Sequence, residues 1–129
     1  MNSCANADQR PGALIVEDDT LLMMDAMDLA EEAGLVAYGA RNADEAIRVL
    51  GAYPDIRILF TDIHMSGSMD GVKLAETVRR EWPPVAIMVT SGVREPSTRD
   101  LPSDSLFFTK PYPPQSVIQA MSAIASRPS

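Results

Sequence analysis

Short apolar runs alternate along this chain with segments in which apolar residues recur every three or four positions. The first run, at residues 13–16, has no polar position, which is typical of a strand covered on both faces of a sheet. Similar runs follow at regular intervals. The pattern predicts strands at 13–16, 35–40, 56–60, 85–89 and 106–108.

The segments between these runs have the periodicity of amphipathic helices. In the first, Leu22, Ala26, Leu29, Ala30 and Ala33 recur on one face, and Asp19 or Thr20 can cap its start. Gly34 is expected to end it. Further helices are predicted from Asn42 or Asp44 to about residue 50, from Val72 to Trp82, and around residues 117–124.

Strands that alternate with helices predict right-handed βαβ units and a parallel sheet covered by helices on both faces. Five strands in about 120 residues fit a flavodoxin-like, doubly wound α/β fold with strand order 2-1-3-4-5. The fourth helix is the exception. Pro96 and Pro102 lie where it is expected, so it is predicted to be short or irregular.

Composition excludes several classes of protein. The 129 residues include 18 acidic and 11 basic side chains, for a net charge of -7. This balance argues against a nucleic-acid-binding surface and against a polybasic membrane patch. Cys4 is the single cysteine, which excludes an intrachain disulfide. A hydrophobic content of 46% is normal for a globular protein.

The ends of the sequence also fit a single globular domain. Residues 1–11 are polar and are expected to form a flexible tail, and residues 12–127 are expected to form one domain. No apolar run approaches the roughly 20 residues of a membrane span, and no signal peptide is recognisable. We therefore expect a cytoplasmic protein. Whether the chain is part of a longer protein stays open.

Candidate chemistry gathers where the predicted strands end. In doubly wound folds, ligands bind outside the carboxyl ends of the strands. The first strand is followed by Glu17-Asp18-Asp19, the third ends at Asp62, the fourth at Thr90-Ser91, and the fifth at Lys110-Pro111. The sequence therefore predicts carboxylates, a hydroxyl and an ammonium group on one rim.

Carboxylates that converge in this way need a proton or a cation. Mg²⁺ is the divalent cation usually held by one or two carboxylates together with phosphate oxygens. The ammonium of Lys110 and the hydroxyl of Thr90 suit a phosphoryl group, and an aspartate can accept that group as an acyl phosphate. Asp62 is the best candidate for this nucleophile, because it ends a central strand between the acids and the lysine.

The ordered set of motifs resembles the receiver domain of two-component response regulators. The residues that carry the resemblance are Leu14-Ile15-Val16-Glu17-Asp18-Asp19, Leu59-Phe60-Thr61-Asp62-Ile63-His64-Met65, Met69-Asp70-Gly71, Val89-Thr90-Ser91-Gly92 and Phe107-Phe108-Thr109-Lys110-Pro111. The resemblance covers about residues 12–126. Each motif alone can also have an ordinary structural role. The acids at 17–19, for example, are typical of a helix N-terminus.

The resemblance implies specific roles. Asp62 matches the phosphoacceptor, Asp18 the direct Mg²⁺ ligand, Glu17 a ligand through water, and His64 the position whose backbone carbonyl binds the metal. Thr90 matches the switch hydroxyl, Phe107 the switch aromatic and Lys110 the phosphate-binding lysine, with Asp19, Ser91 and Pro111 in support. The peptide before Pro111 is often cis in this family.

The resemblance also implies partners. The phosphoryl donor is expected to be a histidine kinase or a histidine phosphotransfer protein, and the output is expected to pass to an unknown downstream protein. The chain would catalyse only its own phosphorylation and dephosphorylation, so it is not an enzyme in the usual sense. We expect a stand-alone receiver that is a monomer or a weak homodimer.

Three features depart from the family pattern. Phe107 stands where Tyr is common, so the switch aromatic lacks a hydroxyl. The loop at residues 65–71 is one residue longer than usual and has Ser66 in place of a proline. The irregular fourth helix puts the usual output surface in question.

Two alternatives remain open at this point. A pseudo-receiver would use the same fold only as a binding module, without phosphorylation. A phosphohydrolase of the haloacid-dehalogenase type would form an aspartyl phosphate, but it needs a second aspartate two residues after the nucleophile. That position is His64 here.

Overall fold

A parallel sheet forms the centre of the computed structural model, which describes residues 10–64, 70–92 and 101–127. The strand order is β2-β1-β3-β4-β5, and each neighbouring pair is parallel, so the predicted topology is confirmed. The strands are β1 (Gly12–Val16), β2 (Val36–Ala40), β3 (Ile56–Asp62), β4 (Ala86–Ser91) and β5 (Leu106–Thr109).

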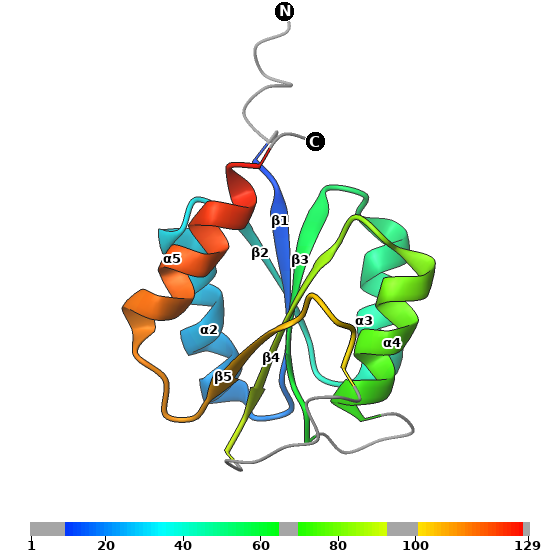
Figure 1. Cartoon of the computed structure of the whole chain (residues 1–129), viewed down its shortest axis with the longest axis horizontal. Helices are drawn as coiled ribbons and strands as arrows, with labels where there is room; N and C mark the ends of the chain where they lie inside the picture. Colours follow the sequence, from blue (N-terminus) through cyan, green and yellow to red (C-terminus); the bar gives the residue numbers. More distant parts are fainter. Residues whose placement is uncertain (1–9, 65–69, 93–100, 128–129) are drawn as a thin grey trace, which may run out of the picture.

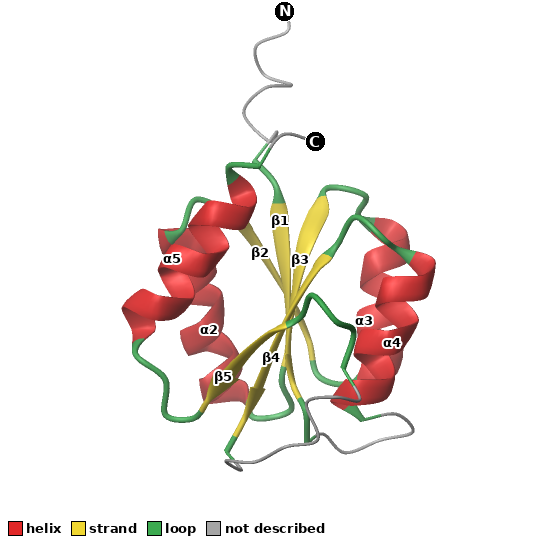
Figure 2. Ribbon diagram, in the orientation of Figure 1, coloured by secondary structure: helices red, strands yellow, loops and turns green. Residues whose placement is uncertain are grey.

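Helices cover both faces of the sheet. Figure 1 shows one pair of helices on each side, and Figure 2 shows the same layers by secondary structure. One face carries α2 (Thr20–Glu32) and α5 (Pro114–Ala125), and the other carries α3 (Ala43–Ala52) and α4 (Gly71–Glu81). This arrangement confirms the predicted doubly wound fold.

Capping side chains set the start of three helices. Asp19 accepts a hydrogen bond from the backbone N–H of Leu22 at 3.1 Å, and so caps α2. Asn42 caps α3 and Asp70 caps α4 in the same way. Each cap satisfies a backbone donor that the helix itself leaves free. At the other end of α2, Gly34 has a φ of 94°, a conformation that favours glycine.

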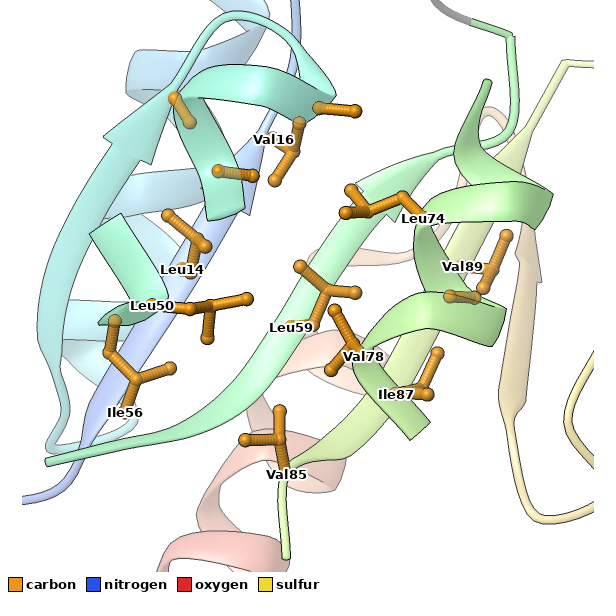
Figure 3. Packing of buried hydrophobic residues seen from close by; sticks show 14 of the residues in the cluster. Leu14, Val16, Leu50, Ile56, Leu59, Leu74, Val78, Val85, Ile87 and Val89 are labelled. Atoms are coloured by element: carbon orange, nitrogen blue, oxygen red, sulfur yellow. The ribbon is translucent and has the colours of Figure 1, made fainter. Parts of the chain in front are cut away.

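The sheet separates two hydrophobic clusters. The cluster under α3 and α4 includes Leu14, Leu59, Leu74, Val78 and Val89, and Figure 3 shows how these side chains meet between the helices and the sheet. The cluster under α2 and α5 is built from buried side chains of the opposite face. Its largest members include Ile15, Leu35, Ile58, Met88 and Met121.

The connection between β4 and β5 returns to α4 before β5 begins. Leu101 is buried in the cluster under α3 and α4, and the guanidinium of Arg79 forms an ion pair with Asp104 at 2.7 Å. Residues 101–105 contain no helix. The prediction of an irregular fourth helix falls mainly on residues 93–100, which lie outside the described residues, as does the lengthened loop at 65–69.

In the part of the chain that the structure describes, no helix has both the length and the apolar character that a membrane crossing requires.

Candidate functional site

An ion-paired cluster lies at the carboxyl ends of β1, β3 and β5. The Nζ atom of Lys110 lies 2.8 Å from Oδ2 of Asp62 and 3.4 Å from Oε1 of Glu17. The side chains of Glu17, Asp62 and Lys110 are only 10%, 11% and 27% exposed. One ammonium therefore bridges two carboxylates that are largely withdrawn from water.

Strand register explains why these groups meet. Val16 of β1 is paired with Thr61 of β3, so that Glu17 and Asp62 follow at the same level of the sheet. Lys110 follows the last residue of β5, and its backbone N–H donates to the carbonyl of Ser91 at 2.8 Å. The peptide between Lys110 and Pro111 is cis, as the resemblance implies. The carboxyl ends of neighbouring parallel strands thus bring the predicted residues together.

Thr90 lies directly beside Asp62. The two residues are paired between β3 and β4, and the backbone N–H of Ile63 donates to the Thr90 carbonyl at 2.9 Å. Thr90 is buried, as is Ser91 after it. The predicted switch hydroxyl is therefore next to the predicted phosphoacceptor.

A close backbone approach fixes the chain after Asp62. The backbone N–H of Gly71 donates to the carbonyl of Ile63 at 2.9 Å, and the N–H of His64 donates to Oδ1 of Asp62 at 3.1 Å. A Cβ atom on Gly71 would lie 2.2 Å from the carbonyl oxygen of Asp62. Only a glycine fits here without a shift of the backbone. Gly71 belongs to the motif Met69-Asp70-Gly71 that carries the resemblance, but the sequence alone does not reveal this close approach.

The site opens into a cavity of about 730 Å³ between α2 and the residues that follow Lys110. Glu17, Asp62, Thr90 and Lys110 line one end of it. The remaining walls are mostly apolar and include Leu22, Ala26, Phe60, Pro111 and Tyr112. Tyr112 packs edge-on against Phe60, with ring centroids 6.0 Å apart. Neither this cavity nor the part that Tyr112 plays in it was predicted from the sequence.

Pro111 is the one further predicted site residue that lines the cavity. The lining of the cavity does not include Asp18, Asp19, His64, Ser91 or Phe107. Asp18 is exposed, and Asp19 is engaged as the cap of α2. The side chain of His64 is exposed, which suits a residue proposed to act through its backbone. Phe107 is half-buried and packs against the cluster under α3 and α4, on the face of the sheet opposite Phe108.

Burial and charge shift the proton affinities in this cluster. Burial raises the pKa of Glu17, and the negative charge of Asp62 adds to this effect, against the opposing influence of the Asp19 N–H and of Lys110. Burial alone would lower the pKa of Lys110. The hydrogen bond to Asp62 and the charges of both carboxylates outweigh it, so the pKa of Lys110 is raised. Lys110 is therefore a charged donor at neutral pH.

The donor set suits a hard cation such as Mg²⁺. Glu17 and Asp62 supply carboxylate oxygens close enough to share one ammonium, and Asp18 follows Glu17 directly. Within residues 10–64, 70–92 and 101–127, no three carboxylate, imidazole or thiol side chains are gathered tightly enough to hold an ion as they stand. Mg²⁺ usually takes only one or two carboxylates and keeps several waters, so the residues present fit the ion in chemistry.

Comparison with known proteins identifies the family and the fold. The family model for the response regulator receiver domain matches residues 13–122. The chain belongs to this family. The receiver domain is thus a component of two-component signalling, and the clustered residues Glu17, Asp62, Thr90 and Lys110 lie within the matched range.

Solved structures of receiver domains are closely similar. A response regulator receiver protein from Pseudomonas putida has a TM-score of 0.78 and 25% sequence identity, with 88% of this chain and 97% of that chain covered. A receiver protein from Sinorhizobium medicae has a TM-score of 0.81 at 24% identity, with 89% and 94% covered. At 24% identity, the similarity to the Sinorhizobium medicae protein shows a shared fold only.

A curated relative is a longer protein. The nitrogen assimilation regulatory protein NtrX from Azorhizobium caulinodans is 34% identical over 80 residues, which are 61% of this chain. The receiver domain spans only 17% of the length of that relative. What the rest of such a protein does is not carried over to this chain.

Proposed function

We propose that this receiver domain accepts a phosphoryl group on Asp62 from a phosphohistidine of a histidine kinase or a histidine phosphotransfer protein, with Mg²⁺ bound beside it. The observation that carries the proposal is the contact of the Lys110 ammonium with Asp62 and Glu17 at 2.8 and 3.4 Å, next to the buried Thr90. A purely structural ion pair would not need to share a cavity with a third polar residue, Thr90.

The proposed step is a displacement at phosphorus. An oxygen of the Asp62 carboxylate forms a bond to phosphorus, the phosphorus–nitrogen bond of the donor breaks, and its electron pair stays on the imidazole, which takes a proton from water. Mg²⁺, when bound, supplies positive charge that neutralises the phosphoryl oxygens. Glu17, Asp18 and Asp62 would hold the ion, together with the backbone carbonyl of His64.

The residues of the chain supply position and charge for this step. The N–H of His64 holds one oxygen of Asp62, which orients the carboxylate. Lys110 would move from the Asp62 oxygen to an oxygen of the incoming group; its ammonium is charged and partly withdrawn from water, which supports this role. Thr90 would donate its hydroxyl proton to another phosphoryl oxygen.

The consequence of phosphorylation is a change of charge in a nearly buried position. A phosphoryl group adds nearly two negative charges, which bias the hydroxyl of Thr90 toward it. Phe107 packs near β4 on the other face of the sheet and is the aromatic ring proposed to respond. The altered surface of the domain would then be recognised by a downstream protein.

Substitution of the acceptor tests the proposal. We expect wild-type protein incubated with acetyl phosphate and Mg²⁺ to gain the mass of one phosphoryl group, and Asp62→Asn to gain none. Asp28→Asn is the matched control, because Asp28 is a carboxylate that lines the same cavity and has no part in the proposed step. Undiminished labelling of Asp62→Asn would disprove the assignment. Absence of labelling in the wild type and of any Mg²⁺ binding would favour a pseudo-receiver that acts only as a binding module.

A further inference from the structure

A second cavity lies at the opposite end of the sheet. It has a volume of about 570 Å³ and lies where β3 and β4 begin, between the ends of α4 and α5. In Figure 1 this is the upper end of the molecule, where α5 ends. β3 has seven residues, so the cavity lies about 20 Å from Asp62. The volume is within the usual range for small-molecule sites.

The floor of this cavity is apolar and includes an aromatic ring. Ile56, Val85 and Ile124 line it and are almost fully buried, and Trp82 is half-buried beside them. Trp82 is the single tryptophan of the chain. Its indole offers a flat face on which another ring can stack.

Local backbone structure holds this cavity in shape. Trp82 ends α4 with a hydrogen bond from its N–H to the Val78 carbonyl at 2.7 Å, and the N–H of Val85 donates back to the Trp82 carbonyl at 2.9 Å. Two prolines, Pro83 and Pro84, lie within this turn. A closed turn with fixed φ angles loses little further entropy when a ligand binds.

The charged side chains that line the cavity are basic, although the protein is acidic. The net charge of the chain is -7, and yet the charged side chains that line this cavity are Arg57 and Arg127, with no carboxylate among the lining residues. By contrast, four carboxylates and one lysine line the cavity at the phosphorylation site. Guanidinium groups pair readily with carboxylates and also stack on flat rings.

From these features we infer that the cavity between Trp82 and Arg127 binds a small aromatic anion, with its ring on the indole and the apolar floor and its carboxylate at the guanidinium groups. This would be a ligand input separate from phosphorylation, because the two cavities share no lining residue. The inference does not depend on the proposed phosphoacceptor.

Titration with 2-naphthoate tests the inference, with ¹H–¹⁵N NMR spectra as the readout. We expect saturable shifts of the Trp82 indole N–H and of the backbone amides of Val85 and Arg127, with a Kd on the order of 1 mM or tighter. The neutral isostere 2-naphthylmethanol should bind about tenfold more weakly, because it cannot pair with the arginines.

Variants distinguish this site from general adsorption of an aromatic ring. Arg127→Gln should weaken 2-naphthoate about tenfold while leaving 2-naphthylmethanol unchanged. Arg57→Gln should act in the same direction, and Arg80→Gln, an exposed arginine of α4 outside the cavity, should have no effect. Asp62→Asn should bind 2-naphthoate as the wild type does.

Three results would overturn the inference. The first is equal affinity for the acid and the alcohol. The second is an affinity of Arg127→Gln and Arg57→Gln equal to that of the wild type. The third is a set of shifts centred on Leu22 and Tyr112, which line the cavity beside Asp62.

Discussion

The surroundings of Glu17 disfavour the charged form of its carboxyl group. Its pKa is raised by burial and by the neighbouring charge of Asp62. A carboxyl group with a raised pKa binds protons more tightly in the folded state. The folded protein therefore loses stability as the pH rises from the pKa of Glu17 in the unfolded chain, near 4.5, through the raised pKa in the folded state. The penalty is absent in acid, below the ordinary pKa, and is complete once the pH lies above the raised pKa.

Replacement of Glu17 by glutamine should therefore stabilise the protein without Mg²⁺ at pH 7, and the gain should shrink toward pH 4. Glutamine keeps an acceptor for the Asp19 N–H and removes the buried charge. Thermal unfolding followed by circular dichroism at several pH values measures the difference. Glu76→Gln, in an exposed position of α4, is the control. A gain that is the same at pH 4 and pH 7 would contradict this account of Glu17.

Gly71 is the residue whose small size decides where Asp62 lies. A Cβ atom there would lie 2.2 Å from the Asp62 carbonyl oxygen and 2.7 Å from Cα of Ile63, so the backbone of one or both segments must move. We expect Gly71→Ala to lower the free energy of unfolding by about 1 to 3 kcal/mol and to slow labelling by acetyl phosphate.

Gly51→Ala is the matched control for this prediction. Gly51 lies in α3, and a Cβ atom there would meet nothing within 4 Å. Alanine should stabilise that helix by about 0.5 to 1 kcal/mol and leave labelling unchanged. Denaturant unfolding and the labelling rate together measure both variants. Wild-type labelling and stability in Gly71→Ala would refute the close approach.

At the scale of elements, α2 presents apolar side chains to solvent beside Asp62, the proposed phosphoacceptor. Leu21 is 74% and Met24 is 55% exposed, and Leu22 is exposed as well. All the charged side chains of α2 are acidic. Exposed apolar residues grouped on one helical turn are typical of an interaction surface. A partner that brought a phosphohistidine to Asp62, as proposed, would approach this turn, and basic residues around an apolar patch would complement it.

The double variant Leu21→Ser, Met24→Ser separates docking from chemistry. We expect phosphoryl transfer from a phosphorylated histidine kinase or phosphotransfer protein that transfers to the wild type to slow by about tenfold or more. Labelling by acetyl phosphate should not change, because the small donor needs no surface. Leu106→Ser, an exposed leucine of β5, is the control. Equal loss with both donors would mean that the substitutions disturb the site itself.

At the scale of the whole molecule, the topology and the meeting of the strand ends were predictable from the sequence. Apolar runs covered on both faces leave little choice about which segments are strands, and parallel strands bring their ends to one edge. For this reason Glu17, Asp62 and Lys110 could be placed together although they are far apart in the chain. Asp19 was predicted as a possible cap, and the structure confirms it.

What the sequence could not provide is the separation between packed elements. Leu22 has the helical spacing of a core residue, but it is exposed, because its face of α2 opens on the cavity beside Asp62. The width of this cavity depends on how α2 and the residues after Lys110 pack on the sheet. That spacing arises from contacts of many side chains and leaves no periodic signal in the sequence. The close approach of Gly71 to Asp62 likewise depends on the spacing of packed elements, and it leaves no periodic signal in the sequence.

The division of the core by the sheet has a consequence for how such a protein changes over generations. The two hydrophobic clusters share no side chain, so the stability effects of substitutions under α3 and α4 should largely add to those of substitutions under α2 and α5. The face proposed to meet the donor and the face that carries Phe107 can therefore accumulate substitutions separately. A new downstream partner can then be acquired while the proposed phosphoryl donor is kept.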